Sequence, residues 1–488
     1  MIKEINRKKT AAIINLGCKV NKYEADAMKD RFVHAGYQIV EPEDYADVYV
    51  VNTCSVTNMA QKKSRQMLRR AKKQNPEAVI VAAGCYVNAE HDKLKQEVFI
   101  DVIVGNNRKK DIVSIVEEYQ DNRLSDDYYI DINQCIEYEE MGNLDVANMD
   151  HQRAYIKIQD GCNQFCSYCI IPYTRGRVRS RSATHILSEI RQLAAEGVKE
   201  FVLTGIHISS YGIDLRGGSK QYDEVMDAKA GMMNEAEAMQ DVGASLEIVD
   251  LPDLVDAISQ IEKVRRIRLG SLEPRIITDD FLERLCRNDK FCPHFHLSLQ
   301  SACNETLKRM NRKYTIEEFM DKCMRIRAFF DVPAITTDVI VGFPGETEEE
   351  FATTLENLKK LDLYEIHVFK YSMREGTVAQ KLPNQVPEEI KTKRSNILLQ
   401  LTERQKYVYE HAMQGFVEEV LIEERLEKIS QEDPLTEVFI VNQEETEEHL
   451  GIFREKIHYF TGHTKRYVKV KVLAKDDMVN EIVKVQFI

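Results

Sequence analysis

The segment AYIKIQDGCNQFCSYCIIP, residues 154–172, combines a predicted strand with three closely spaced cysteines. Its apolar start is typical of a buried β-strand, and Cys162, Cys166 and Cys169 follow in the next turn. Thiolates at this spacing can bind three corners of an iron–sulfur cube, which a fourth cysteine would close. Because no fourth cysteine lies nearby in the sequence, we expect a [4Fe–4S] cluster with one iron open to a small ligand. A zinc site that lacks one ligand, or a chance spacing, is the alternative.

The predicted strand begins a longer alternation of strands and helices. Further apolar runs follow it, with helix-length stretches between most of them, at residues 200–205, 266–271, 295–300, 336–343 and 365–372. Six β/α units of this kind predict an open or partial (β/α)6 barrel. Ligand-binding loops in such barrels follow the carboxyl ends of the strands, where the cysteine triplet also lies. We assign residues 148–400 to this domain.

Different patterns flank the predicted barrel on both sides. Short apolar runs, separated by helical patterns, predict a doubly wound parallel sheet within an α/β domain at residues 9–122. Residues 123–147 are acidic and weakly periodic, and we interpret them as a linker. From residue 410 to 488 the pattern becomes mostly β, which predicts a small terminal β-barrel.

A second set of cysteines repeats one local context in the N-terminal domain. Cys18, Cys54 and Cys85 each stand just after an apolar run, in NLGC, VNTC and AAGC. Because ligand sites of open parallel sheets form outside the carboxyl ends of the strands, these three thiols can converge on one site. Isolated cysteines are more often small core residues. Three in matched positions favour a second metal site.

Composition limits the class of protein. The chain has 488 residues, too many for one ordinary core, and its net charge of −13 excludes a uniformly basic surface. The N-terminus has no secretory signal pattern, and no run of about 18 apolar residues predicts a membrane span. We therefore expect a cytoplasmic protein without a membrane partner. In a reducing compartment its 11 cysteines are more readily ligands or core residues than disulfides.

The motif CNQFCSYC at 162–169 resembles the signature of the radical S-adenosylmethionine superfamily. The resemblance implies a partial (β/α)6 barrel with the triplet in the loop after the first barrel strand. It also implies that the open iron binds the amino and carboxylate groups of S-adenosylmethionine. Reduction of the cluster then yields methionine and a 5′-deoxyadenosyl radical. The cofactors supply this chemistry, and the protein supplies orientation and a dry pocket.

Nearly the whole chain resembles one branch of that superfamily, the methylthiotransferases. The matching motifs, in order, are GCKVNKYEADAM (17–28), VVNTCSVTNMAQKKSRQ (50–66), AAGC (82–85), CNQFCSYCIIPYTRGRVRSR (162–181), HLSLQS (296–301) and DVIVGFPGET (338–347). The branch implies an auxiliary [4Fe–4S] cluster on Cys18, Cys54 and Cys85, besides the cluster on Cys162, Cys166 and Cys169. No catalytic residue beyond these ligands is implied.

The segment GCKVN is similar to the branch members that act on tRNA carrying N6-threonylcarbamoyladenosine. The resemblance implies methylthiolation of the adenine C2 carbon at position 37, next to the anticodon. S-adenosylmethionine then serves as methyl donor and radical source, and an external donor such as flavodoxin or ferredoxin supplies electrons. Isopentenyladenosine in tRNA or a ribosomal-protein side chain is the alternative substrate. A non-catalytic iron–sulfur protein that binds RNA is a more distant alternative.

Two further groups of residues are expected from the resemblance. The first is expected at S-adenosylmethionine and comprises Thr204, Gly205, Gln300, Ser301, Gly342 and Pro344. The second is expected at RNA and comprises Arg175, Arg177, Arg179 and Arg181, together with Lys465 and Arg466 of a terminal barrel that resembles a TRAM domain. Alternation would place the four arginines on one face if their segment were extended. Ala302 departs from the usual glycine, and an acidic, methionine-rich insertion at 216–245 receives no role.

Overall fold

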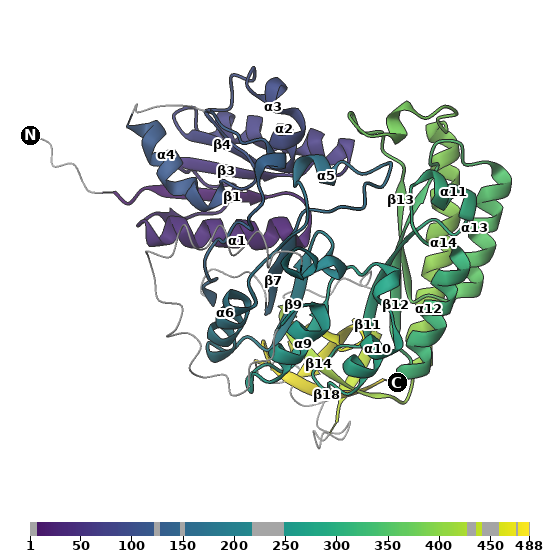
Figure 1. Ribbon diagram of the computed structural model, residues 1–488. Coiled ribbons are helices and arrows are strands. Elements are labelled where there is room, and N and C mark those ends of the chain that lie inside the picture. The colour runs from purple at the N-terminus through teal and green to yellow at the C-terminus, as the bar shows by residue number, and fades with distance from the viewer. Residues whose placement is uncertain are drawn as a thin grey trace, which may run out of the picture.

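The computed structural model describes residues 7–121, 127–146, 152–216, 248–426, 436–441, 458–474 and 477–487. An N-terminal sheet, a central open barrel and a C-terminal closed barrel follow one another along the chain (Figure 1). The α/β fold with a terminal small barrel is as predicted. The acidic, methionine-rich insertion lies largely outside the described residues.

The N-terminal sheet has six parallel strands in the order β2-β1-β3-β4-β5-β6. They are β1 (Thr10–Asn15), β2 (Gln38–Ile39), β3 (Val48–Thr53), β4 (Val79–Gly84), β5 (Val102–Val104) and β6 (Asp127–Tyr128). The helices are α1 (Lys19–His34), α2 (Asn58–Gln74), α3 (Cys85–Leu94) and α4 (Ile112–Gln120). Side chains at alternate strand positions enter two separate cores, one with α1 and α4 and the other with α2 and α3. The sheet is therefore covered on both faces, as doubly wound sheets are.

The central domain forms an open barrel from two small sheets. The first, in the order β10-β9-β7-β8, contains β7 (Arg153–Asp160), β8 (Arg179–Ser180), β9 (Glu200–Gly205) and β10 (Arg266–Leu269). The second contains β11 (His294–Gln300), β12 (Ala334–Val341) and β13 (Glu365–Lys370). Isolated bridges, Ile267 with Phe291 and Leu272 with Leu297, join the two sheets. The helices are α5 (Ile171–Thr174), α6 (Ala183–Ala195), α7 (Ile213–Arg216), α9 (Leu251–Ser259), α10 (Asp279–Cys286), α11 (Asn304–Arg309), α12 (Ile316–Phe329), α13 (Glu348–Leu361) and α14 (Glu388–Ala412).

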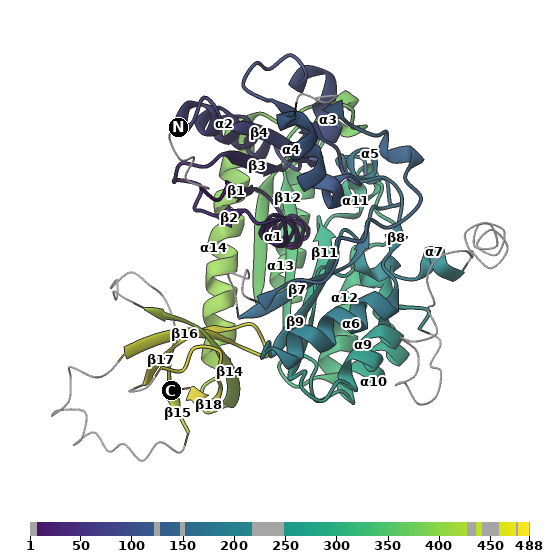
Figure 2. The same ribbon diagram turned by 90° about the vertical axis from the view of Figure 1, so that its left-hand side faces the viewer.

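Helix α1 joins the N-terminal domain to the barrel. Figure 2 shows it end-on, between the N-terminal sheet and β7. Its residue Glu24 pairs with Lys157 of β7, with 2.7 Å between Oε1 and Nζ, and both side chains are buried. The large hydrophobic core is continuous from α1 into the barrel strands and their helices. The two domains are thus packed as one body through α1.

The C-terminal barrel closes in the order β14-β16-β17-β15-β18 and follows the long helix α14. Its strands are β14 (Val417–Leu426), β15 (Thr436–Ile440), β16 (His458–Thr464), β17 (Lys469–Ala474) and β18 (Ile482–Phe487). In Figure 1 it lies below the amino ends of β7, β9 and β11. The turn between β16 and β17 contacts this floor, where the Tyr467 ring stacks on His294 with centroids 4.7 Å apart.

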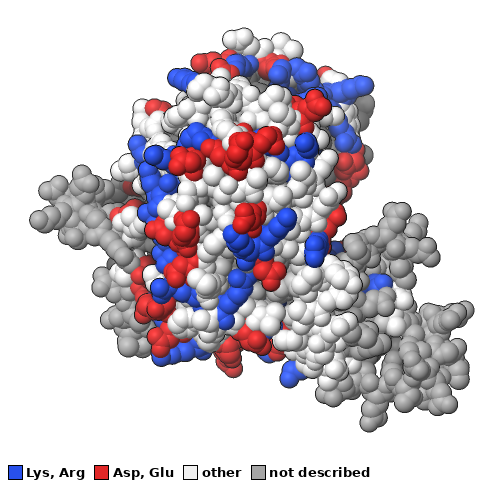
Figure 3. Space-filling model, turned by 90° about the vertical axis from the view of Figure 1, so that its right-hand side faces the viewer, with Lys and Arg blue, Asp and Glu red and all other residues white. Residues whose placement is uncertain are grey.

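Two expectations about the whole molecule can be compared with this arrangement. The segment interpreted as a linker contains β6, which pairs with β5 as the edge strand of the N-terminal sheet. Basic and acidic side chains are interspersed on the face shown in Figure 3, in keeping with the acidic net charge. Among the described residues, no helix is long and apolar enough to cross a membrane.

Candidate functional site

The first cysteine triplet lies on a loop that backbone hydrogen bonds fix directly after β7. The Cys162 amide donates to the Gly176 carbonyl at 3.0 Å, and the Cys169 amide donates to the Cys166 carbonyl at 2.9 Å. Gly161 begins the loop with a φ of +72°, and a Cβ there would lie 1.8 Å from the carbonyl oxygen of Arg177. The loop therefore needs glycine at this position, both for its backbone conformation and for the close approach of residue 177.

The distances within the triplet separate a cluster from a single ion. Among the described residues, only His296, Asp338 and His367 bring potential ligand atoms within 4.8 Å of one another, and no set of three cysteines does so. Thiolates on one zinc ion would lie ~3.8 Å apart, given a Zn–S bond of about 2.3 Å. The thiols still interact electrostatically with one another. The three thiols are therefore not spaced as ligands of one zinc ion, which disfavours the zinc alternative.

The thiols of the first triplet must lose their protons when a metal binds. Burial raises the pKa of the Cys162 thiol to about 11 and that of the Cys169 thiol to about 12. Metal ligands bind as thiolates, so cluster assembly displaces these protons. A cation already stands close by, because Arg312 donates from Nη1 to Cys166 Sγ at 3.4 Å and from Nη2 to the Ser298 carbonyl at 2.9 Å. Arg312 is 146 positions from Cys166, and no sequence motif indicated it.

The residues expected at S-adenosylmethionine fall into two groups. Thr204 at the end of β9, Gln300 at the end of β11 and Pro344 after β12 lie at the carboxyl edge of the barrel strands. The other three positions have structural roles. A Cβ on Gly205 would lie 2.9 Å from the Gln159 carbonyl oxygen, a Cβ on Gly342 would lie 2.3 Å from Lys391 Cγ, and the buried Ser301 Oγ accepts from the Cys303 amide at 3.3 Å.

One polar atom near this edge has no partner. His207, two residues after β9, has a buried Nε2 without a hydrogen bond among the described residues, while its Nδ1 is 2.6 Å from Ser210 Oγ. Burial and the nearby Arg312 lower the pKa of His207 to about 4, so the ring is neutral. An orphaned buried nitrogen in this position fits a site that takes a polar cosubstrate. His207 follows closely on Thr204 and Gly205, which had been expected at the cosubstrate instead.

The second triplet gathers at the carboxyl edge of three adjacent strands. Cys18 precedes α1 after β1, Cys54 follows β3, and Cys85 begins α3 after β4. Their thiols interact electrostatically, and burial raises the pKa of Cys54 to about 11. Cys18 is exposed, yet desolvation by the surrounding protein raises the pKa of its thiol. Two of these cysteines stand at helix N-termini, whose partial positive charge favours thiolates.

A buried ionic network joins the two triplets. Arg175, six residues after Cys169, donates from Nε to Cys85 Sγ at 3.1 Å and from Nη2 to Asn21 Oδ1 at 2.7 Å. Its Nη1 lies 2.8 Å from Glu24 Oε1 and 3.1 Å from Asp160 Oδ2. Coulombic attraction to Arg175 and Lys157 holds the pKa of the Glu24 and Asp160 carboxyls low despite their burial. The chain after the first triplet is therefore bonded to a sulfur of the second.

This network corrects the prediction that four alternating arginines contact RNA. Arg175, Arg179 and Arg181 are at most 1% exposed. Arg179 donates to the carbonyls of residues 175 and 135, and Arg181 pairs with Glu189 and Glu140. The prediction is wrong for these three because the segment turns inward instead of lying extended on the surface. Arg177 alone is exposed, with its guanidinium 4.4 Å from the Phe165 ring centroid.

The two basic residues of the terminal barrel also face inward. Lys465 donates to the Asp289 carbonyl at 2.8 Å, and Arg466 donates to the Val332 carbonyl at 2.9 Å and pairs with Glu418. These bonds attach the terminal barrel to the central domain. The structure engages both side chains within the chain, and the RNA contact through Lys465 and Arg466 stays a prediction.

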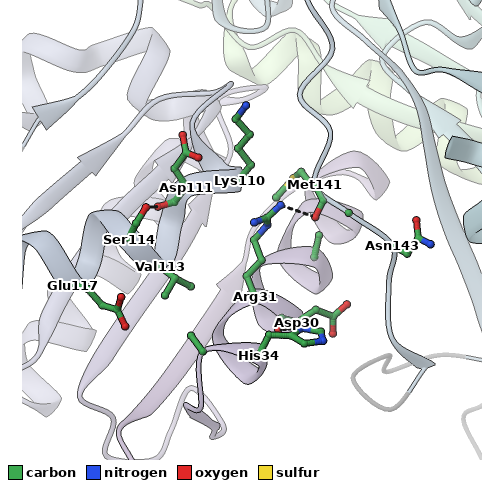
Figure 4. A pocket seen from close by; sticks show the side chains of 13 residues that line it. Asp30, Arg31, His34, Lys110, Asp111, Val113, Ser114, Glu117, Met141 and Asn143 are labelled. Carbon is green, nitrogen blue, oxygen red and sulfur yellow. Dashed lines mark hydrogen bonds between the residues drawn. The ribbon is translucent and has the colours of Figure 1, made fainter. Parts of the chain in front are cut away.

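One open hollow of the surface includes neither cysteine triplet. It has a volume of about 710 Å³ and lies between α1, α4 and residues 141–143 (Figure 4). Its lining includes Arg31, which donates to the Met141 carbonyl at 3.0 Å, and contains no cysteine. It has no part in the arrangement described above.

Comparisons with known proteins agree with this organisation. Residues 156–358 match the radical SAM superfamily, and residues 10–105 match an uncharacterized protein family designated UPF0004. A threonylcarbamoyladenosine tRNA methylthiotransferase MtaB of Bacillus subtilis is 38% identical, over 98% of this chain and 94% of its own length. The protein of the same name in Aquifex aeolicus is 36% identical, over 83% of this chain and 90% of its own length. A tRNA-2-methylthio-N(6)-dimethylallyladenosine synthase of Clostridium botulinum is 33% identical, over 86% and 87%.

Proposed function

The chain belongs to the family of radical S-adenosylmethionine tRNA methylthiotransferases, and we propose that it methylthiolates C2 of N6-threonylcarbamoyladenosine at position 37 of tRNA. Two relatives named for that substrate match the chain more closely than the relative named for dimethylallyladenosine, at 38% and 36% against 33% identity. The protein is an enzyme that transfers a sulfur-containing group, and its macromolecular partner is tRNA.

The observation that carries this proposal is the pairing of the two cysteine triplets. Cys162, Cys166 and Cys169 are proposed to hold the cluster that binds S-adenosylmethionine, and Cys18, Cys54 and Cys85 the auxiliary cluster. Arg175 spans the two, since it belongs to the loop of the first and bonds to Cys85 of the second. A radical generator alone needs only the first triplet. A second three-thiolate site held against it is what a sulfur-inserting reaction requires.

When bound, the two [4Fe–4S] clusters and S-adenosylmethionine supply the methyl group, the sulfur chemistry and the radical that removes hydrogen from C2. The residues of this chain position those groups. Arg312 and Arg175 each donate an N–H to a cysteine sulfur, which stabilises the thiolate and fixes its direction. His207 offers an unpaired ring nitrogen at the carboxyl edge of the barrel. Thr204, Gln300 and Pro344 line that edge as further candidates. A reduced flavodoxin or ferredoxin is proposed as electron donor.

Iron and sulfide counts on two triple variants test the proposal. We expect about eight irons per wild-type chain and about four after alanine replaces either triplet, because each triplet holds one four-iron cluster. A wild-type count near four would remove the auxiliary cluster. A strain that lacks this protein is expected to lose 2-methylthio-N6-threonylcarbamoyladenosine from its tRNA, and persistence of that nucleoside would contradict the substrate.

The alternatives predict different products. If the substrate is isopentenyladenosine, the deletion strain keeps its 2-methylthio-N6-threonylcarbamoyladenosine. If the substrate is a ribosomal-protein side chain, the deletion changes no tRNA nucleoside. A non-catalytic RNA-binding protein would form no 5′-deoxyadenosine from S-adenosylmethionine after reduction. Detection of that product excludes it.

A further inference from the structure

Lys19 of GCKVN reaches the interior of the open barrel, although it belongs to the N-terminal domain. It is the first residue of α1 and follows Cys18 directly. Its ammonium lies within electrostatic range of residues on four different barrel strands, namely Arg153 of β7, Glu200 of β9, Arg268 of β10 and Asp338 of β12. Because α1 itself packs against β7 and β9, we place the Lys19 side chain in the space that the barrel strands enclose.

The acids nearest to this space are already paired. Glu200 Oε1 lies 2.8 Å from Arg268 Nε, and Glu200 Oε2 lies 3.4 Å from Arg266 Nη1. Arg153 pairs with Glu423 of the terminal barrel at 3.3 Å. Coulombic attraction to Arg268, hydrogen bonding to it, and Arg153 together lower the pKa of Glu200 to about 2 despite burial. The Glu200 carboxyl is therefore charged at neutral pH.

Lys19 itself has no such partner. No hydrogen bond or ion pair to its ammonium occurs among the described residues, although its side chain is open to water. Its electrostatic surroundings hold Arg268 and Arg153 as well as Glu200 and Asp338, and the two arginines have the larger influence on its ammonium. An unpaired cation next to other cations favours an anionic ligand.

Polar groups on the facing strands complete this subsite. His296 of β11, Asp338 of β12 and His367 of β13 bring their ligand atoms within 4.8 Å of one another. Asp338 Oδ2 lies 3.3 Å from His296 Nε2, and His296 Nδ1 lies 2.9 Å from Thr336 Oγ1. These three residues resemble a divalent metal site, but Lys19 in range of Asp338 opposes a cation there. Hydrogen bonding to a neutral polar group agrees better with the charges.

Aromatic and basic side chains pack together at the amino-end floor of the barrel. The Tyr467 ring stacks between His294, at 4.7 Å, and His463, at 4.6 Å. The Arg268 guanidinium lies 4.9 Å from the same ring and that of Arg153 lies 5.4 Å from it. A substituent that enters from the cysteine edge therefore ends among Lys19 and the facing histidines.

We propose that Lys19 binds the carboxylate of the threonyl group on the substrate base, with His296, Asp338 and His367 facing its hydroxyl and carbamoyl groups. This inference rests on the proposed function. In adenine only N1 separates C2 from C6, which carries the N6 substituent. A base whose C2 faces the auxiliary site at Cys18 thus places that substituent beside the next residue, Lys19. A dimethylallyl group carries no charge and would leave the ammonium unpaired, so Lys19 selects between the two tRNA substrates.

The test compares two tRNAs on the reconstituted holoenzyme. One carries N6-threonylcarbamoyladenosine, and the other carries the same nucleoside with its carboxylate converted to a methylamide. We expect wild-type kcat/KM to be roughly 10- to 100-fold higher for the carboxylate, the range for one charge-assisted hydrogen bond. In Lys19→Met this ratio is expected to fall to near one, and Lys19→Arg is expected to restore part of it. The loss should appear mainly in KM.

Controls separate the possible failures. Lys22→Met removes the same charge from the same helix, where Lys22 pairs with Asp26, and is expected to keep the wild-type ratio. 5′-Deoxyadenosine formation without tRNA checks that Lys19→Met still makes the radical. A Lys19→Met enzyme that keeps the full preference, or a wild type that shows none, overturns this inference while methylthiolation persists. A wild type that modifies neither tRNA but modifies one carrying dimethylallyladenosine overturns the proposed function as well.

Discussion

Replacement of Arg175 by methionine should release the auxiliary site from the barrel. The side chain is fully buried and bonds to Cys85, Asn21, Glu24 and Asp160. Removing one partner of a buried ion pair costs about 3–5 kcal/mol. Lys157 remains beside both carboxylates in the variant, at 2.7 and 2.6 Å, so the lower end applies. We therefore work with about 3 kcal/mol for the docked N-terminal domain.

This magnitude can be measured in two ways. With a urea m-value of about 1–3 kcal/mol/M, 3 kcal/mol lowers the midpoint of the transition that exposes the N-terminal domain by about 1–3 M. Loss of the N–H bond to Cys85 also weakens the auxiliary site, so iron should fall from about eight toward about four per chain. The assays are far-UV circular dichroism in urea and iron analysis after anaerobic reconstitution.

Two companion variants locate the effect. Arg177→Met removes the same charge two residues away, where the guanidinium only stacks on Phe165 at 4.4 Å, and should keep both the midpoint and the iron. Arg175→Lys keeps the charge but loses the planar fork, so an intermediate iron content is expected. If Arg175→Met bound eight irons with an unchanged urea midpoint, the ionic network would not hold the auxiliary site, and the reasoning would be refuted.

Three other changes test separate parts of the structure. Gly161→Ala should lose the radical cluster and keep about four irons, because its Cβ would meet a carbonyl oxygen at 1.8 Å, whereas Gly197→Ala, with positive φ but nothing within 4 Å, should keep all of them. Glu200→Gln should be less stable at pH 7. Its wild-type carboxyl has a pKa of about 2 against 4.5 for an unperturbed glutamate, so its stabilisation of about 3 kcal/mol is full above pH 4.5 and disappears toward pH 2. In urea titrations, the free energy of unfolding should fall less between pH 7 and pH 3 in the variant than in the wild type. Tyr467→Ala should make the terminal barrel more sensitive to proteolysis, since one ring stack, on His294, and two cation–π contacts, with Arg153 and Arg268, attach it to the barrel floor.

Local patterns in the sequence were sufficient for the fold. The barrel strands β7 and β9 to β13 lie where apolar runs predicted them, and the N-terminal domain has the predicted parallel sheet. Both cysteine triplets were found in the same way, because each depends on the position of a cysteine relative to one strand. Segment β6 was missed, since a strand of two residues leaves no periodic pattern.

Charged residues were predicted less well than strands. The alternation of arginines at 175–181 was interpreted as a surface because isolated charges rarely lie inside proteins. Their burial depends on acids that lie far away in the sequence, such as Glu24, which is 151 positions from Arg175. Arg312 was missed for the same reason. A single sequence does not state which distant charges will meet, so burial of a charge can be read only from the folded chain.

Buried ion pairs join the N-terminal domain to the barrel, although apolar packing is usually at least as stable. The charge balance at this interface explains their presence. Four cations, Lys109, Lys157, Arg175 and Arg179, surround two carboxylates, those of Glu24 and Asp160. Thiolates at the adjacent auxiliary site, where Arg175 contacts Cys85, would offset this positive excess. Docking of the domains should therefore strengthen auxiliary metal binding, and metal binding should by the same amount strengthen docking, because the two equilibria are linked. An apolar interface would hold the domains together without this coupling. The buried arginines thus make the docked arrangement the one in which the auxiliary site is best able to bind its metal.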